Sequence, residues 1–261
     1  MAKGMDATSS GESLDGIGSN KPKSSSMHVG PGFRISLLDA AVDTAVLEGL
    51  KEFDAPAISD MMNRLYTMET AIHCLTYPVA KRVAGPACTV KVFPGDNLMV
   101  HKALDVVKPG EVLVIDASST SLNAVVGDII ATKARHRQIA GFVIDGLVRD
   151  IEGIIALGNM PVFARGVTPI GPLHRGPGEI NFPVSVGGIV VHAGDYVIGD
   201  MNGVVVVPKD AAADVLARLQ RQRQGEGDYL AAVREGTFSN AWVDKELSAS
   251  GLEIHLSDPR Q

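Results

Sequence analysis

Apolar positions along the chain follow two different periods, and the change between them separates helices from strands. Between Phe33 and about residue 75, apolar side chains recur every three or four residues, which is typical of helices with one buried face. A first helix is expected along the stripe from Leu37 to Leu50, and a second from Ala57, directly after Asp54-Ala55-Pro56. From Val79 onward, short β-branched runs end at glycine or proline, and this change predicts strands.

The second part of the chain alternates predicted strands with predicted helices. Strands are expected at Val83 to Val92, Val112 to Asp116, Gly141 to Asp145, Val162 to Ala164, Gly188 to His192 and Val204 to Pro208. Helices are expected at Asp96 to Val106, Gly127 to Gln138, Asp150 to Leu157 and Lys209 to Gln224. Several strands are apolar on successive residues, which favours strands buried on both faces. The pattern predicts a layered α/β domain over about residues 75–210, with flanking N- and C-terminal helices.

The two ends of the chain differ from this pattern. Residues 1–32 have almost no apolar side chains to offset the entropy of ordering, so we expect a disordered tail there. We expect a single domain over 33–245 and a C-terminal tail over 246–261. No apolar run approaches the roughly 18–20 residues that span a bilayer, and no secretory signal is visible. A cytoplasmic location is therefore expected.

Composition narrows the class of function. Among 261 residues, 45% are hydrophobic, 24 are Lys or Arg and 30 are Asp or Glu, which gives a formal net charge of −6. An acidic chain lacks the basic footprint of a nucleic-acid-binding protein, so no nucleic-acid partner is expected. Two cysteines, Cys74 and Cys88, cannot form a disulfide framework or a four-thiolate metal site. The composition indicates an ordinary globular domain without disulfides.

The first candidate site is the segment around Gly127 and Asp128. It follows a loop of small residues and opens an apolar helical pattern. Unpaired backbone N–H groups at a helix start can bind a carboxylate or a phosphate, and the helix dipole favours Asp128 in the first turn. A plain glycine turn with an acidic cap explains the same residues, so both interpretations stay open.

The second candidate is the run Val143-Ile144-Asp145-Gly146-Leu147-Val148-Arg149-Asp150, where a buried strand leads into a turn. Ligands of α/β sheets bind at the carboxyl ends of strands. Arg149 can bind a carboxylate with two hydrogen bonds, and Asp150 suits a hard cation such as Mg²⁺ that keeps several waters. The alternative is a helix start with a local ion pair.

The third candidate is a Gly/Pro-rich loop around residues 166–180, longer than a plain connection needs. It could serve as a lid or a subunit contact. His174 within it could be a ligand or a proton carrier, although a lone loop histidine is more often simply solvated. Motifs for dinucleotides, P-loop nucleotides, zinc proteases and serine hydrolases are absent from the sequence, which leaves metal-assisted acid chemistry as the leading enzyme class.

Several short motifs occur in the order found in one known family. They are Val83-Ala84-Gly85-Pro86-Ala87-Cys88-Thr89-Val90, Pro94-Gly95-Asp96-Asn97-Leu98, Gly127-Asp128, Val148-Arg149-Asp150, Gly194-Asp195 and Asp200-Met201-Asn202-Gly203-Val204. The most specific is the interval of twenty residues between Asp128 and Arg149. Over about residues 54–236 the chain resembles the family of the regulator of ribonuclease activity A and the class II 4-hydroxy-4-methyl-2-oxoglutarate / 4-carboxy-4-hydroxy-2-oxoadipate aldolases.

This resemblance implies a fold and an assembly. The fold is a layered α/β/β sandwich of the swivelling-domain type. The assembly is a homotrimer or a hexamer of stacked trimers, in which a glutamate of the neighbouring subunit completes each site. Glu226 is the best match for that catalytic glutamate in this chain.

The resemblance also assigns roles to the candidate residues. Asp150 would hold Mg²⁺ or Mn²⁺, mostly through waters. Arg149 would bind the oxo acid and stabilise the enolate, and Asp128 would orient a water in proton transfer. The segment of Gly127, Ile129 and Ile130 would bind substrate, with the backbone N–H groups of the two isoleucines receiving the pyruvyl carboxylate.

One position departs from the family pattern. The aldolases continue Arg-Asp-x-x-Glu/Asp, whereas this chain has Glu152 one position early and Gly153 in the place of the acid. One residue along a helix rotates a side chain by roughly 100°, so Glu152 is not expected to replace that acid. Metal binding is expected to survive this change.

The expected function is a divalent-metal-dependent C–C lyase acting on a pyruvyl-type 2-oxo acid. It would perform retro-aldol cleavage of 4-hydroxy-4-methyl-2-oxoglutarate-like substrates, oxaloacetate decarboxylation, or both, through a metal-stabilised pyruvate enolate. One alternative is a non-catalytic regulator that binds and masks a ribonuclease or another partner enzyme. Another is a family lyase with an unrelated acid substrate. The set of Asp128, Arg149 and Asp150 favours an enzyme, because binding alone does not require it.

Overall fold

The computed structural model describes residues 32–37, 42–225 and 227–252. The strands are β1 (Phe33–Ile35), β2 (His73–Cys74), β3 (Val83–Val92), β4 (Val112–Asp116), β5 (Ala124–Val126), β6 (Gly141–Val148), β7 (Val162–Val167), β8 (Gly178–Ile180), β9 (Val184–Val186), β10 (Ile189–Val191), β11 (Tyr196–Asp200) and β12 (Gly203–Val207). The helices are α1 (Thr44–Leu50), α2 (Ala55–Met61), α3 (Leu98–Ala103), α4 (Asp128–His136), α5 (Ile151–Ala156), α6 (Ala212–Gly225), α7 (Gly227–Glu235) and α8 (Ala241–Ala249).

The central sheet has the strand order β1-β8-β3-β4-β6-β7-β2. Strands β3, β4, β6 and β7 are parallel neighbours, so their carboxyl ends lie at one edge of the sheet. Near this edge β6 changes register, and its last residues pair with β5. The long strand β3 also pairs antiparallel with β11, which continues into β12. This topology brings the ends of β5 and β6 together.

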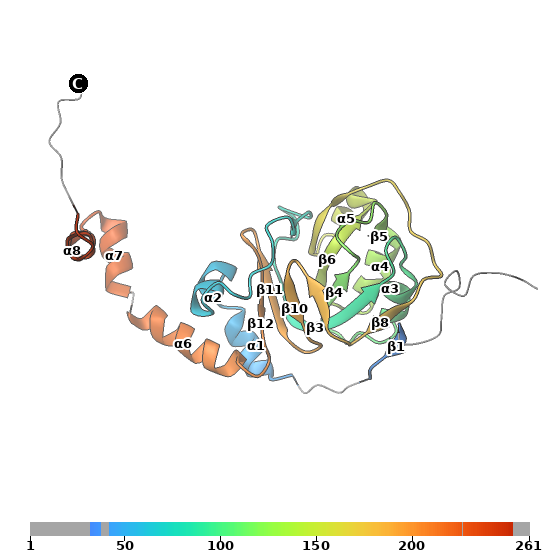
Figure 1. Ribbon diagram of the computed structural model, residues 1–261, viewed down its shortest axis with the longest axis horizontal. Coiled ribbons are helices and arrows are strands. Elements are labelled where there is room, and N and C mark those ends of the chain that lie inside the picture. Colours follow the sequence, from blue (N-terminus) through green and yellow to red (C-terminus); the bar gives the residue numbers. More distant parts are fainter. Residues whose placement is uncertain (1–31, 38–41, 226, 253–261) are drawn as a thin grey trace, which may run out of the picture.

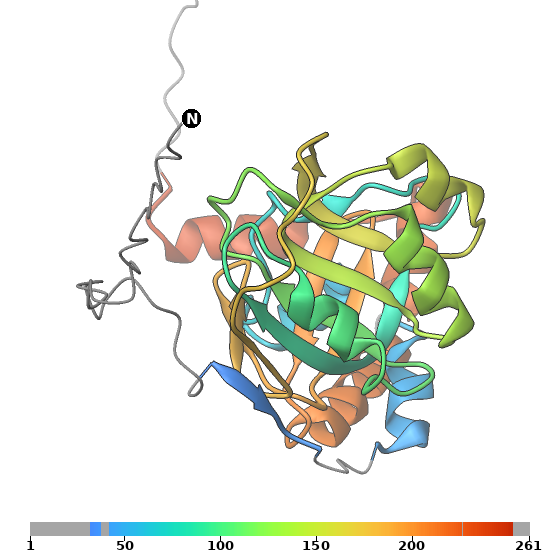
Figure 2. The same ribbon diagram turned by 90° about the vertical axis from the view of Figure 1, so that its right-hand side faces the viewer.

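Four layers are visible across the molecule (Figure 1). Helices α3, α4 and α5 cover one face of the central sheet, and Figure 2 looks onto these green helices. The other face packs on β11, β12 and the β9–β10 hairpin, and helices α1, α2 and α6 cover the far side of β11 and β12. Residues of β4 alternate between two cores, with Leu113 and Ile115 under the helices and Val112 and Val114 between the sheets. Such burial on both faces explains the continuous apolar run of this strand.

The predicted fold class, a layered α/β/β sandwich with flanking helices, is confirmed. The bounds predicted for two of the strands, β3 and β4, are those observed. β6 extends beyond its predicted end, because pairing with β5 carries it on to Val148. The sequence did not predict β1, β2, β5, β8, β9 or β11, which are two to five residues long.

The terminal regions also differ from expectation. Leu37 is exposed and lies outside any helix, and α1 begins only at Thr44, where the Asp43 side chain caps the N–H of Val46. The remainder of the predicted stripe over 38–41, the tail over 1–31 and residues 253–261 lie outside the described residues. Helix α8 runs across residue 245, where the predicted domain ended. Within the described part of the chain, no helix has the length and apolarity needed to cross a membrane.

Candidate active site

The first part of the site is the junction between β5 and α4. Gly127 is the N-cap of α4 in an extended conformation, and Asp128 is the first residue of the helix. The carboxylate Oδ1 of Asp128 accepts a hydrogen bond of 2.7 Å from the backbone N–H of Ile129. The side chain of Ile130 is buried in the core under the helix, while that of Ile129 is 61% exposed. The helix start therefore has the acidic first turn that the sequence indicated.

The second part of the site is the end of β6. The backbone N–H of Arg149 donates to the carbonyl of Val126 at 3.0 Å, which ties this end to β5. Asp150 follows with φ 55° and ψ 38°, a left-handed conformation that is uncommon for a residue other than glycine. This conformation ends the strand sharply and starts α5. Held this way, the Arg149 Nε and Asp150 Oδ2 atoms are 3.1 Å apart, and both side chains are about 40% exposed.

Gly127 lets these two parts approach closely. A Cβ atom at this position would lie 2.7 Å from Asp150 Oδ2 and 3.2 Å from Arg149 Cγ. The φ of Gly127, −137°, is accessible to any residue, so close approach rather than backbone conformation explains the glycine. The Arg149–Asp150 pair therefore packs directly on the start of α4.

Gly153 on α5 makes a second close approach. A Cβ atom on Gly153 would lie 2.9 Å from Asp128 Cβ and 3.2 Å from Asp128 Oδ2. The Asp128 side chain thus occupies the space that a side chain at position 153 would need. This is the position at which the sequence departs from the family pattern.

The opposite wall of the site comes from α3 and the loop after β7. Asn97, the N-cap of α3, donates through Nδ2 to the carbonyl of Val125 at 3.1 Å. Its Oδ1 is 2.7 Å from His174 Nδ1, and the rings of His174 and His101 are 5.7 Å apart in an edge-to-face arrangement. Burial, then the nearby Lys133, and then His174 lower the pKa of His101.

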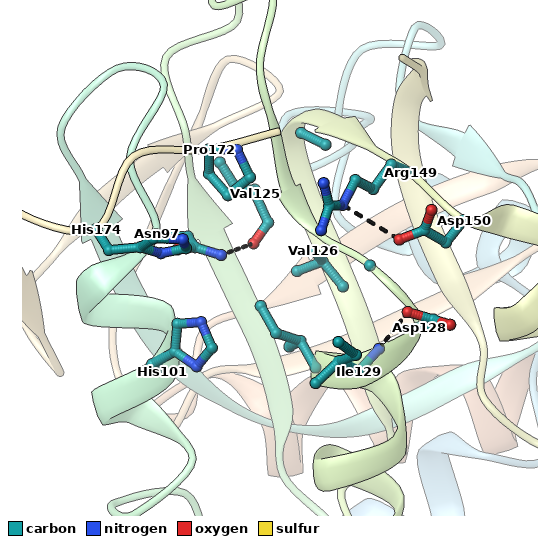
Figure 3. Close-up of a pocket in the computed structure, with 13 residues that line it drawn as sticks. Asn97, His101, Val125, Val126, Asp128, Ile129, Arg149, Asp150, Pro172 and His174 are labelled. Atoms are coloured by element: carbon teal, nitrogen blue, oxygen red, sulfur yellow. Dashed lines mark hydrogen bonds and ion pairs between the residues drawn. The ribbon is translucent and has the colours of Figure 1, made fainter. Parts of the chain in front are cut away.

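These walls enclose a cavity of about 270 Å³. Figure 3 shows Arg149, Asp150 and Asp128 on one side and Asn97, His101 and His174 on the other, with β5 between them. This volume lies close to the lower end of the range for small-molecule pockets, roughly 300–1,000 Å³. This space suits a small organic acid.

The structure brings together most of the predicted site residues. Asp128, Arg149 and Asp150 line this cavity, and so does the predicted substrate-binding segment, Gly127, Ile129 and Ile130. Glu226 lies outside the described residues, between the last residue of α6 and the first of α7.

Asp145, part of the second candidate run, serves another purpose. It is buried and accepts hydrogen bonds from Arg165 Nε at 2.5 Å and from the backbone N–H of Gly187 at 2.7 Å. Asp145 therefore joins β6 to β7 and to the β9–β10 turn, outside the cavity.

Two residues of the cavity, Asn97 and His101, were missed as site residues. Asn97 stands within a motif of the family resemblance, but nothing in the sequence pairs it with His174, which is 77 residues further along. The backbone bonds from Asn97 N–H to Leu173 O and from Leu173 N–H to Gly95 O bring the two segments together.

The oxygen donors of the site fit a hard divalent cation better than a softer metal. The described residues contain no group of three or more His, Cys, Asp and Glu side chains that could hold a metal. Asp150 is a partly exposed carboxylate at the rim of the cavity. Mg²⁺ is commonly held by one or two carboxylates and several waters, and this donor set matches that pattern.

A family model described as RraA-like, Aldolase/RraA, matches residues 55–206. The chain belongs to this family. A relative from Halalkalibacterium halodurans, named "Putative 4-hydroxy-4-methyl-2-oxoglutarate aldolase", is 37% identical over 194 residues, which cover 74% of this chain and 91% of that protein.

Solved structures of other proteins resemble this fold. An uncharacterized protein from Pseudomonas syringae pv. tomato matches with a TM-score of 0.67 and 30% identity, covering 76% of this chain and 92% of that one. Streptomyces coelicolor RraAS2, described as an unusual member of the RNase ES inhibitor RraA protein family, matches with a TM-score of 0.64 and 26% identity, covering 72% and 96%. The family thus includes proteins named as aldolases and proteins named as ribonuclease inhibitors.

Proposed function

We propose that this RraA-like protein is a divalent-metal-dependent C–C lyase that cleaves pyruvyl-type 2-oxo acids. Retro-aldol cleavage of 4-hydroxy-4-methyl-2-oxoglutarate-like substrates and oxaloacetate decarboxylation are its two candidate reactions. The observation that carries the proposal is the convergence of Asp128, Arg149 and Asp150 at one end of a cavity of about 270 Å³. A surface that only bound a partner would need no such arrangement.

The chain's own groups account for binding of the oxo acid. The guanidinium of Arg149 faces the cavity and offsets negative charge that develops on the 2-oxo oxygen as the bond breaks. Backbone N–H groups in the first turn of α4 lack carbonyl partners within the helix, so those of Ile129 and Ile130 receive the substrate carboxylate. Asp128, which accepts from the Ile129 N–H without substrate, then releases that donor and orients the water that protonates the product.

Asp150 is the residue that would hold Mg²⁺ or Mn²⁺, with waters completing the shell. Bound there, the ion supplies Lewis-acid polarisation of the substrate's carboxylate and carbonyl oxygens. The ion pair between Arg149 and Asp150 fixes the direction of both side chains before substrate arrives.

Glu226 completes the site in our proposal, donated by a neighbouring subunit of a homotrimer or hexamer. Helices α7 and α8, which follow it, have no buried residue and project away from the body (Figure 1). Tyr229, Leu230 and Trp242 expose apolar surface on them, which supports burial against another copy. Light scattering of the purified protein tests the assembly, and a monomer would contradict it.

The test of function is pyruvate release from 4-hydroxy-4-methyl-2-oxoglutarate and from oxaloacetate, with Mg²⁺ or Mn²⁺ and again with EDTA. We expect turnover that requires the metal and is lost in Asp150→Ala. The matched control is Asp105→Ala, which removes a surface carboxylate paired with Lys102 and Arg137 and should keep full activity. Full activity of Asp150→Ala would refute the metal assignment.

The alternative function is regulation of a partner enzyme by binding, which the name of the Streptomyces coelicolor relative suggests. The same assay separates the two functions. Absence of turnover on both substrates with either metal would favour the binding role.

A further inference from the structure

His174 lies in a loop that is held on both sides of it. The backbone of Leu173 exchanges hydrogen bonds with Gly95 and Asn97, at 2.8 and 3.0 Å. On the other side, Oδ2 of the buried Asp96 accepts from the N–H groups of Arg175 and Gly176, at 2.7 and 2.8 Å. The loop therefore places this histidine at the cavity wall, where its Nδ1 pairs with Asn97 while the side chain stays exposed to solvent.

A chain of hydrogen bonds determines which nitrogen of His174 carries the proton. Asn97 Nδ2 donates to the Val125 carbonyl, so the amide oxygen Oδ1 must be the atom that faces His174. An amide oxygen only accepts, so His174 Nδ1 must donate to it across 2.7 Å. In the neutral ring, Nε2 is then the atom with the lone pair.

The position of this lone pair matters because of the residues that line the rest of the cavity. Arg149, Asp150 and the start of α4 take the pyruvyl half of a substrate at one side. A substrate bound in this way would extend its other half, which leaves as the second product, toward the wall of Asn97, His101 and His174, which line the opposite side of the cavity. Both hydrogen-bonding atoms of the Asn97 side chain are already engaged with Val125 and His174.

We propose that His174 is the catalytic base for the hydroxyl group on the leaving half of a 4-hydroxy-2-oxo acid. His174 Nε2 accepts a hydrogen bond from the 4-hydroxyl and removes its proton as the C3–C4 bond breaks. This role rests on the proposed lyase function and adds the residue that distinguishes aldol cleavage from decarboxylation.

The step balances without any further reactant. The 4-hydroxyl proton moves to Nε2, and the O–H electron pair becomes the new C4 carbonyl bond. The C3–C4 electron pair moves to C3, giving the enolate of pyruvate whose oxygen faces Arg149. C3 then takes a proton from water, and the imidazolium returns its proton to solvent, to which His174 is exposed.

His101 lies beside this base, with its ring centre 5.7 Å from that of His174. Its lowered pKa, caused by burial, Lys133 and His174 in that order, favours a neutral ring beside His174 at neutral pH. A neutral ring at His101 suits a hydroxyl group, whereas a charged ring there would suit a second carboxylate.

Oxaloacetate provides the internal comparison, because it has no 4-hydroxyl and its leaving half is carbon dioxide. We expect His174→Gln, which can still donate to Asn97, to lower retro-aldol kcat by about 10² or more, the usual contribution of a general base. Decarboxylation of oxaloacetate by the same variant should stay within about threefold of the parent. Imidazole added to the His174→Ala variant should restore part of the rate of retro-aldol cleavage and leave the rate of decarboxylation unchanged. The control is His73→Gln, which replaces an exposed histidine on β2 and should change neither rate.

The outcomes separate the role of His174 from the function of the site. Equal losses of both activities in His174→Gln, or no loss in either, would overturn the role while leaving the lyase function standing. A parent protein that cleaves neither substrate would overturn the lyase function and this role together.

Discussion

Substitution of Gly127 by alanine tests whether the Arg149–Asp150 pair and the start of α4 form one reacting centre. The added Cβ would lie 2.7 Å from Asp150 Oδ2 and 3.3 Å from Arg149 Nε. Carbon–oxygen contacts in proteins lie at about 3.3 Å or more, so the carboxylate must move by about 0.6 Å. The oxygen that moves is the one that pairs with Arg149.

A displacement of this size should affect catalysis much more than stability. Misplacement by about 1 Å can cost about 10² in rate, so we expect kcat/KM to fall about 10- to 100-fold, or about 1.4–2.7 kcal/mol of transition-state stabilisation. Alanine can adopt the backbone conformation of Gly127. Alanine also lowers the conformational entropy of the unfolded chain, which offsets part of the loss in folding free energy caused by the close contact. The melting temperature should therefore stay near that of the parent.

The assay is steady-state pyruvate release with a titration of Mg²⁺. Gly171→Ala serves as a comparison, because it also adds a methyl group next to Arg149. Its Cβ would lie 2.8 Å from Arg149 Nη1, the far end of a flexible side chain that can move aside, so its effect should be smaller. Parental kcat/KM and metal dependence in Gly127→Ala would refute the argument that this packing positions the reacting groups.

Three further substitutions probe the surroundings of the site and the core. Gly153→Ala should lower kcat about tenfold by displacing Asp128, whose Cβ lies 2.9 Å from the new methyl group, and unchanged kcat would argue against the role of Asp128. Burial raises the pKa of Glu111, so ionising this carboxyl group lowers the free energy of unfolding as pH rises through that raised pKa. Glu111→Gln should therefore raise the melting temperature relative to the parent more at pH 7 than at pH 4, and an equal shift at both would contradict this sign. Phe163→Ala, in the fully buried core between the sheets, should cost about 3–5 kcal/mol in urea unfolding, whereas a loss under about 1 kcal/mol would contradict the packing described.

The sequence predicts the buried centre of the fold well, because burial leaves a strong local pattern. β4 has a continuous apolar run, and β3 begins and ends with valines and is buried at eight of its ten positions, so the bounds of both strands could be predicted. β5 and β8 have three residues each and form through pairing with other strands, β6 and β3, which no local pattern encodes. The weak local signal of short paired strands accounts for most of the elements that the sequence did not predict.

The candidate site also has a part that the sequence predicts and a part that it does not. The residues at the ends of β5 and β6 stand at helix starts and strand ends, where the sequence itself marks chemistry. The wall of Asn97 and His174 depends on a backbone pairing between the segment before α3 and the loop after β7. Because neither segment has a periodic pattern that implies the other, only the folded chain shows that His174 shares a cavity with Arg149.

A crystal structure of the protein with Mn²⁺ and pyruvate tests the central claim most directly. The account predicts anomalous density for the metal beside the Asp150 carboxylate, with waters completing its shell. It also predicts the pyruvate carboxylate at the N–H groups of Ile129 and Ile130, and the 2-oxo oxygen next to Arg149. Metal and pyruvate bound elsewhere on the protein, with only water in this cavity, would contradict the account.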